Sequence, residues 1–279
     1  SSIEKGVRLR NTDLVKKELQ LFLDNKIPQV KFIDRTFNCN HKHAMEIWRY
    51  IYEHDNGVTN FHFEISADLL TEEELELLNQ MRVGLVQLEI GVQSTNEETV
   101  CEIRRKMNFS KVSEMVTRVK EIGGIHQHLD LIAGLPNENY ESFGKSFDDV
   151  FALRPEQLQL GFLKVLKGSY MYENRGAYGL VYRSEPPYEV LSTNWVSYDE
   201  MIRLKGIEQM VELYYNSHQY DKTLKEVLER EESAFQFFES FGDDYRSKGY
   251  HLVNHSRKEK YYIFKEFLEK RYPEMGEYY

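Results

Sequence analysis

Two strand-like runs that alternate polar and apolar residues constrain the possible fold of this chain more than any other feature. The first is Val86–Ser94 (VQLEIGVQS) and the second is His126–Pro136 (HQHLDLIAGLP). Parallel strands are usually buried on both faces and read as near-continuous apolar runs. Here one face of each strand is polar, carrying Gln87, Glu89, Gly91 and Gln93 in the first run and His126, His128 and Asp130 in the second. Buried polar groups need partners, so we expect a polar ligand at the carboxyl ends of these strands.

Composition and charge narrow the class of protein. The chain has 279 residues, of which 41% are hydrophobic and 29% charged, which suits one large domain or two smaller ones. No apolar run is long enough for a membrane span, and no signal peptide is apparent. A net charge of −10 argues against broad nucleic-acid binding. The only cysteines, Cys39 and Cys101, form no CxxC pair, which disfavours a disulfide framework and favours a cytoplasmic location.

The first two-thirds of the chain repeats one helix–strand unit. We expect strands at 30–37, 60–66, 85–91, 125–133 and 157–166, and helices at about 12–25, 41–54, 71–80, 96–105, 110–122 and 139–151. Such alternation predicts right-handed βαβ units and a parallel sheet. Thr12, Thr71 with Glu74, and Ser110 are the expected helix caps. A barrel or half-barrel requires one more strand before residue 12. We expect the chain to start just after that missing strand.

The sequence predicts three regions. Residues 1–170 form the α/β part, and residues 171–197, with scattered Gly, Pro and Tyr, form an irregular lid or connector. Residues 198–279 form a helical region, with helices at about 198–216, 221–229, 231–241 and 257–271. The aromatic stripe Phe235, Phe237, Phe238 and Phe241 is typical of a packed helical core rather than of a cofactor site.

Four polar residues lie near the ends of the first three predicted strands. Asp34 and Glu64 stand at equivalent heights on neighbouring strands, where α/β enzymes bind ligands. Gln93 and Ser94 follow Gly91, and an amide that donates and accepts suits a zwitterionic or nucleoside ligand. The alternatives are that Asp34 pairs with the adjacent arginine or caps a helix, and that Ser94 or its neighbour caps the next helix.

Further candidates lie on the following elements. Asp130 precedes a Gly-Leu-Pro turn, and Arg104 and Arg105 end a helix from which a guanidinium could reach a ligand carboxylate. A solvated face is the alternative for this arginine pair.

A metal-dependent function is an alternative. His126 and His128 have the His-x-His spacing of metal ligands on one strand face. A divalent-metal hydrolase would use these two histidines with Asp130 and Asp34 to activate water. A third reading is a non-catalytic module whose polar strand faces pair internally.

The order of these motifs resembles the radical S-adenosylmethionine (SAM) superfamily, and more closely its cobalamin-associated members with a helical C-terminal region. The resemblance covers roughly residues 1–170 and rests on the segments FIDRTF (32–37), Glu64, LEIGVQS (88–94), IRR (103–105), DLIAGLP (130–136) and LKVLKGS (163–169). It implies a partial (β/α)6 TIM-like barrel, here without its first strand, followed by a C-terminal helical region. It also implies a radical SAM iron–sulfur oxidoreductase or methyltransferase that acts on a small organic substrate.

The resemblance assigns roles to matching residues. Gln93 and Arg105 would hold the methionine part of SAM, with Ser94 beside them. Asp130 and Glu64 would bind the ribose or other polar edges. The backbone around Val165 would flank the adenine, and Asp34 would face the substrate or the SAM amino group.

One departure from the family is large. The Cys-x3-Cys-x2-Cys loop that holds the family's [4Fe–4S] cluster is absent, and Ser1–Gly6 resembles the stretch downstream of that loop. We therefore expect a piece of a longer protein that lacks the cluster ligands, the first strand and any cobalamin domain. The resemblance implies SAM, the cluster and, in the full-length protein, cobalamin as cofactors. We expect that this chain alone does not cleave SAM, and that the exposed barrel edge favours a homodimer.

Overall fold

The computed structural model describes residues 7–273, so the predicted role of Ser1–Gly6 lies outside the described residues. The chain divides between Trp195 and Val196 into two compact units. Among the described residues, no helix is both long enough and apolar enough to cross a membrane.

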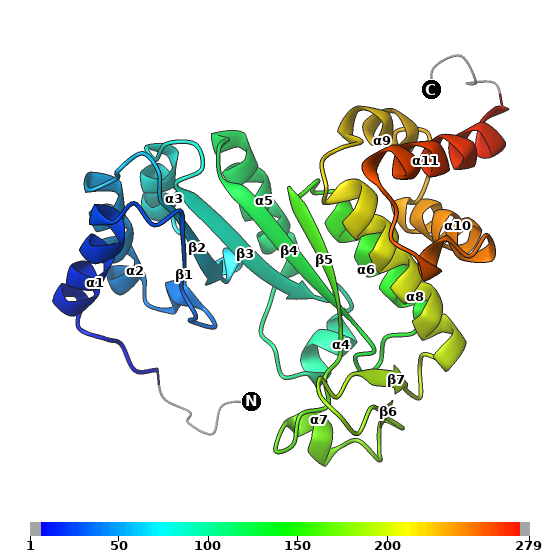
Figure 1. Ribbon diagram of the computed structural model, residues 1–279. Coiled ribbons are helices and arrows are strands. Elements are labelled where there is room, and N and C mark those ends of the chain that lie inside the picture. Colours follow the sequence, from blue (N-terminus) through cyan, green and yellow to red (C-terminus); the bar gives the residue numbers. More distant parts are fainter. Residues whose placement is uncertain (1–6, 274–279) are drawn as a thin grey trace. The chain divides into compact units, whose positions relative to one another are not determined.

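The first unit is built on a five-stranded parallel sheet whose strands follow chain order, β1-β2-β3-β4-β5 (Figure 1). These strands are β1 (Gln29–Lys31), β2 (Asn60–Ile65), β3 (Val86–Gln93), β4 (His126–Ala133) and β5 (Gln157–Phe162). Helix α1 (Thr12–Asp24) precedes β1, and the helices between the strands are α2 (His41–Glu53), α3 (Glu72–Asn79), α4 (Glu97–Glu102), α5 (Phe109–Ile122) and α6 (Tyr140–Phe151). The predicted α/β partial barrel is confirmed.

The strand register gives the sheet one polar and one apolar face. Glu64 pairs with Glu89, and Glu89 in turn pairs with His128, so these side chains share a face. The other face carries fully buried apolar side chains such as Phe63, Leu88 and Leu129. Their burial provides the hydrophobic stabilisation of the unit, and the polar face is what sets this sheet apart from an ordinary parallel one.

The predicted first strand, Val30–Phe37, is wrong over most of its length. Strand β1 ends at Lys31, and ladder pairing stops after the Phe32 amide donates to the His62 carbonyl. Beyond it, the buried Asn38 takes over the pairing. Its amide nitrogen donates to the Ser66 carbonyl and its oxygen accepts from the Ser66 amide, both at 3.0 Å. A side chain thus replaces the backbone ladder and turns the chain into a 3₁₀ turn, Phe37–Cys39.

Two predicted caps are also wrong, and one is confirmed. Asn11, not Thr12, caps α1, and Asn108, not Ser110, caps α5. In both cases an asparagine just upstream accepts the first free amides. The capping box of α3 forms as predicted, from Thr71 and Glu74.

Short elements complete the first unit after β5. They are α7 (Tyr170–Glu173) and an antiparallel pair, β6 (Val181–Tyr182) and β7 (Val190–Ser192).

The second unit is helical, with α8 (Tyr198–Met210), a π turn (Val211–Tyr215), α9 (Asp221–Leu228), α10 (Ala234–Ser247) and α11 (Arg257–Arg271). Phe237, Phe238 and Phe241 are fully buried in it. The aromatic stripe is therefore core, as predicted.

Candidate functional site

Three carboxylates meet on the polar face of the sheet. Glu64, Glu89 and Asp130 stand on β2, β3 and β4, and Lys31 of β1 forms an ion pair with Glu89 at 2.7 Å. Burial raises the pKa of Glu64, and the charges of Glu89 and Asp130 raise it further. The centre of the face is thus rich in negative charge and favours a cationic ligand.

Arg105 brings a positive charge to the carboxyl end of β3. Its guanidinium donates to the Gly91 carbonyl. Burial lowers the pKa of Arg105, and the nearby charges of Asp68, Glu64 and Asp130 act in the opposite direction. The guanidinium is therefore half-buried among carboxylates, in a position to pair with a ligand carboxylate.

Gln93 shares this space with Arg105. A Cβ atom added to Gly91 would lie 2.5 Å from the Gln93 amide nitrogen and 3.7 Å from the Arg105 guanidinium nitrogens. The register of β3 against β4 shifts here, and Gln93 has a φ of +73°. A non-glycine residue held in the left-handed region is often found at functional sites.

Arg104 points elsewhere. Its guanidinium lies 3.9 Å from the centre of the Tyr170 ring, and its side chain is exposed. The adjacent arginines thus have separate environments.

The hydroxyl of Ser94 is used inside the protein. It donates to Glu138 at 2.6 Å and accepts from the Asn96 amide, while Ser146 also donates to Glu138. Burial raises the pKa of Glu138 to about 7. Neither Ser94 nor Thr95 caps the following helix, since Asn96 does so.

Asp130 and Val165 complete the strand ends. The Oδ1 atom of Asp130 lies 3.0 Å from Nε2 of His128 without hydrogen-bond geometry. Val165 is fully buried after β5, and its amide donates to the Tyr188 carbonyl.

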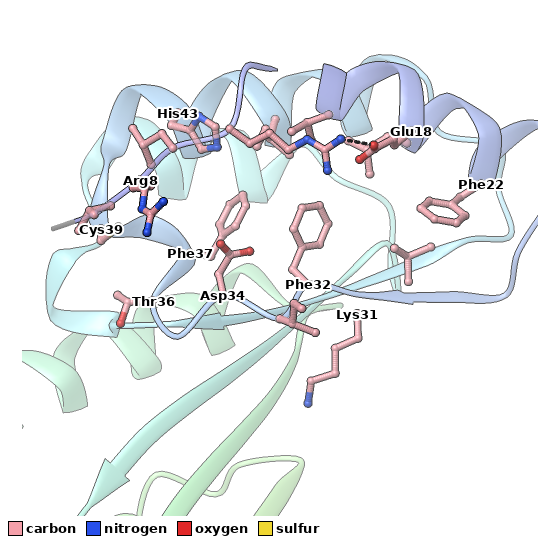
Figure 2. A pocket seen from close by; sticks show the side chains of 18 residues that line it. Arg8, Glu18, Phe22, Lys31, Phe32, Asp34, Thr36, Phe37, Cys39 and His43 are labelled. Atoms are coloured by element: carbon pink, nitrogen blue, oxygen red, sulfur yellow. Dashed lines mark hydrogen bonds and ion pairs between the residues drawn. The ribbon is translucent and has the colours of Figure 1, made fainter. Parts of the chain in front are cut away.

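Asp34 lies apart from these residues, in a pocket of about 410 Å³ between α1, α2 and β1. Figure 2 shows Asp34 on the same side of the chain as Phe32, with Lys31 pointing to the opposite side. None of Glu64, Gln93, Arg105 or Asp130 lines this pocket.

The structure gathers a set of metal-ligand side chains of which sequence reasoning named only His128 as a ligand. Within residues 7–273 the set is His62, Glu89 and His128, and it includes none of His126, Asp130 and Asp34 of the predicted hydrolase set. The alternation in Phe61–Ile65 places His62 and Glu64 on one face and could have identified His62.

A family model described as "Radical SAM superfamily" matches residues 2–150, more than half of the chain. The chain belongs to the radical SAM superfamily. A second model, described as "Protein of unknown function (DUF4080)", matches residues 176–278.

Curated relatives match over shorter stretches. The oxygen-independent coproporphyrinogen III oxidase of Salmonella typhimurium is 31% identical over 107 residues, which is 36% of this chain and 23% of that protein. The oxygen-independent coproporphyrinogen-III oxidase-like protein HemZ of Bacillus subtilis is 30% identical over 118 residues, 42% of this chain and 23% of that protein. The matched stretches thus span less than a quarter of these relatives' length.

A solved structure shares the fold. The radical SAM methyltransferase TsrM from Kitasatospora setae, with cobalamin and a [4Fe–4S] cluster bound, has a TM-score of 0.54 and 18% identity, covering 64% of this chain and 37% of that one. Coproporphyrinogen III oxidase (HemN) from Escherichia coli has a TM-score of 0.49 and 17% identity, covering 74% of this chain and 48% of that one.

The two cofactors that the family implies differ in how well they fit this chain. SAM carries a sulfonium, an ammonium and a carboxylate, and the strand ends offer carboxylates beside one guanidinium. A [4Fe–4S] cluster needs thiolates. The sequence holds only Cys39 and Cys101, which line different pockets, so its residues fit SAM and do not fit the cluster.

Proposed function

We propose that this chain is the SAM-binding core of a radical SAM iron–sulfur oxidoreductase or methyltransferase that acts on a small organic substrate. The observation that carries the proposal is the Arg105 guanidinium, which is anchored on Gly91 beside Gln93 and faces the charges of Asp68, Glu64 and Asp130. A zwitterionic ligand with an added sulfonium charge complements this arrangement.

Each strand-end residue takes one role in the proposal. Arg105 and Gln93 bind the carboxylate and the methionine part of SAM. Glu64 and Asp130 bind the ribose hydroxyls and offset the positive charges of SAM.

The remaining roles belong to the same proposal. Ser94 acts through Glu138 to hold the turn that carries Gln93. The backbone around Val165 flanks the adenine, and the pocket around Asp34 favours a substrate contact.

The proposal for this chain is limited to binding and orienting SAM. Formation of a 5′-deoxyadenosyl radical needs a cluster whose thiolate ligands the sequence does not contain. We propose that step, and any use of cobalamin, only for a protein in which those ligands are supplied.

Equilibrium titration of SAM and S-adenosylhomocysteine into the full chain tests the proposal. We expect tighter binding of SAM, because only SAM carries the sulfonium charge that the carboxylates favour. Arg105→Gln should weaken both ligands by about 10-fold to 100-fold, since a hydrogen bond between charged groups contributes about 1.5–3 kcal/mol.

Arg104→Gln is the matched control, and it should leave both affinities unchanged because Arg104 packs on Tyr170. Equal loss of affinity in the two variants, or no loss in either, would contradict the proposal.

A further inference from the structure

Three metal-ligand side chains stand on adjacent strands of the polar face. His62 comes from β2, Glu89 from β3 and His128 from β4, and their ligand atoms lie within 4.8 Å of one another. Ligand atoms around a tetrahedral zinc ion are about 3.3 Å apart, given metal–nitrogen distances of about 2.0–2.1 Å. Small side-chain rotations on a rigid sheet would therefore close this set around one ion.

Both imidazoles are buried, and one ring nitrogen of each lacks the hydrogen bond that a buried polar atom usually makes. His62 and His128 are 7% and 6% exposed, and the Nε2 atom of each is buried without a hydrogen-bond partner. Yet His62 Nε2 lies 2.8 Å from Glu89 Oε2. Two acceptor atoms this close repel each other unless a proton or a cation lies between them.

The charge around the set also favours a cation. The Glu89 carboxylate belongs to the set, and the Glu64 and Asp130 carboxylates stand on the neighbouring strands of the same face. A divalent cation would offset this negative charge, since buried charges need partners.

The Lys31 ammonium is a cation that would compete with a metal ion for Glu89. Its ammonium lies 2.7 Å from Glu89 Oε2, and its side chain is 51% exposed. It can therefore swing into solvent when another cation binds.

We propose that His62, Glu89 and His128 bind one divalent transition-metal ion, and that Lys31 competes with the ion for Glu89. Two imidazoles and one carboxylate form the ligand set of zinc sites that keep an open position and of non-haem iron(II) sites. Gln93 and Arg105 are not among these ligands. Asp130, a proposed SAM contact, lies 3.0 Å from His128 Nε2, so the proposed metal site adjoins the proposed SAM site there.

Calorimetric titration of the chelator-stripped full chain with Zn²⁺, in the absence of SAM, tests the site. We expect one bound ion per chain. His62→Gln and His128→Asn should each lower the affinity at least about tenfold. The matched control is His54→Gln, at an exposed histidine outside the set, which should bind as the wild type does.

Lys31→Met keeps the test decisive even if the ligand variants fail to fold. An exposed ion pair contributes about 0.2–1 kcal/mol, so removing the competitor should raise the affinity for Zn²⁺ by a factor of about 1.4 to 5. If the three side chains only pair with one another, neither the wild type nor Lys31→Met should bind Zn²⁺.

Co²⁺ and anaerobic Fe²⁺ are the second probes. Visible ligand-field absorption from bound Co²⁺ that disappears in His62→Gln would support the site, as would Fe²⁺ binding with the same dependence on the variants. Substoichiometric binding of Zn²⁺ and Fe²⁺ by both the wild type and Lys31→Met would overturn the proposal, as would full affinity in folded ligand variants.

Discussion

At the residue scale, Gly91 leaves the space that Gln93 and Arg105 share. Gly91→Ala would place a Cβ atom 2.5 Å from the Gln93 amide nitrogen, and this flexible side-chain end would have to move. We expect the fold to persist and the affinity for SAM to fall about fivefold, since a displaced hydrogen bond contributes about 1 kcal/mol. Gly176→Ala, with open space around the added Cβ atom, is the control for the titration.

Glu138 gives a second prediction at this scale, and it concerns pH. Burial raises the pKa of Glu138 from its ordinary value of 4.5 to about 7 in the folded chain, despite hydrogen bonds from Ser94 and Ser146. The folded state thus binds more protons than the unfolded state between these values, so stability falls as the pH rises from about 4.5 to about 7. Glu138→Gln should remove this dependence.

Urea unfolding of the wild type and of Glu138→Gln at pH 5 and pH 8 measures the effect. The free energy of unfolding of the wild type, relative to the variant, should be lower at pH 8 than at pH 5 by on the order of 2–3 kcal/mol. A difference between the two proteins that does not change with pH would rule out the raised pKa.

At the element scale, Asn38 decides where β1 ends. It is buried and makes two hydrogen bonds to the backbone of Ser66. Asn38→Ala leaves that amide and carbonyl unpaired, so we expect the free energy of unfolding to fall by about 2–3 kcal/mol. Asn79→Ala, at an exposed position at the end of α3, should change it by less than about 0.5 kcal/mol. Similar values for the two variants would show that Asn38 does not anchor this turn.

Strand β1 also shows which parts of the fold could be predicted from the sequence and which could not. Periodicity placed β2 to β5 and the helices between them, because apolar alternation and burial follow directly from backbone geometry. It failed at β1, because the pairing of Asn38 with Ser66 joins residues that are distant in the chain. For the candidate site, strand placement proposed Glu64 and Gln93, and the family resemblance proposed Arg105. Neither pointed to His62, whose approach to Glu89 and His128 depends on the register between strands.

At the scale of the whole molecule, the two units carry different information. The radical SAM model matches residues 2–150, and every residue proposed to bind SAM lies in the first unit. The second model matches residues 176–278, which include the helical second unit. The proposed SAM site therefore predicts that side chains of the second unit can change without loss of SAM binding.

Calorimetric titration of the full chain with SAM tests the central claim most directly. We expect one SAM to bind the wild type and no measurable binding to Gln93→Ala/Asp130→Ala. The matched control, Gln219→Ala/Asp199→Ala, changes the same residue types at exposed positions of the second unit and should bind SAM as the wild type does. Absence of binding to the wild type, or unchanged binding to the strand-end variant, would contradict a SAM site on these strands.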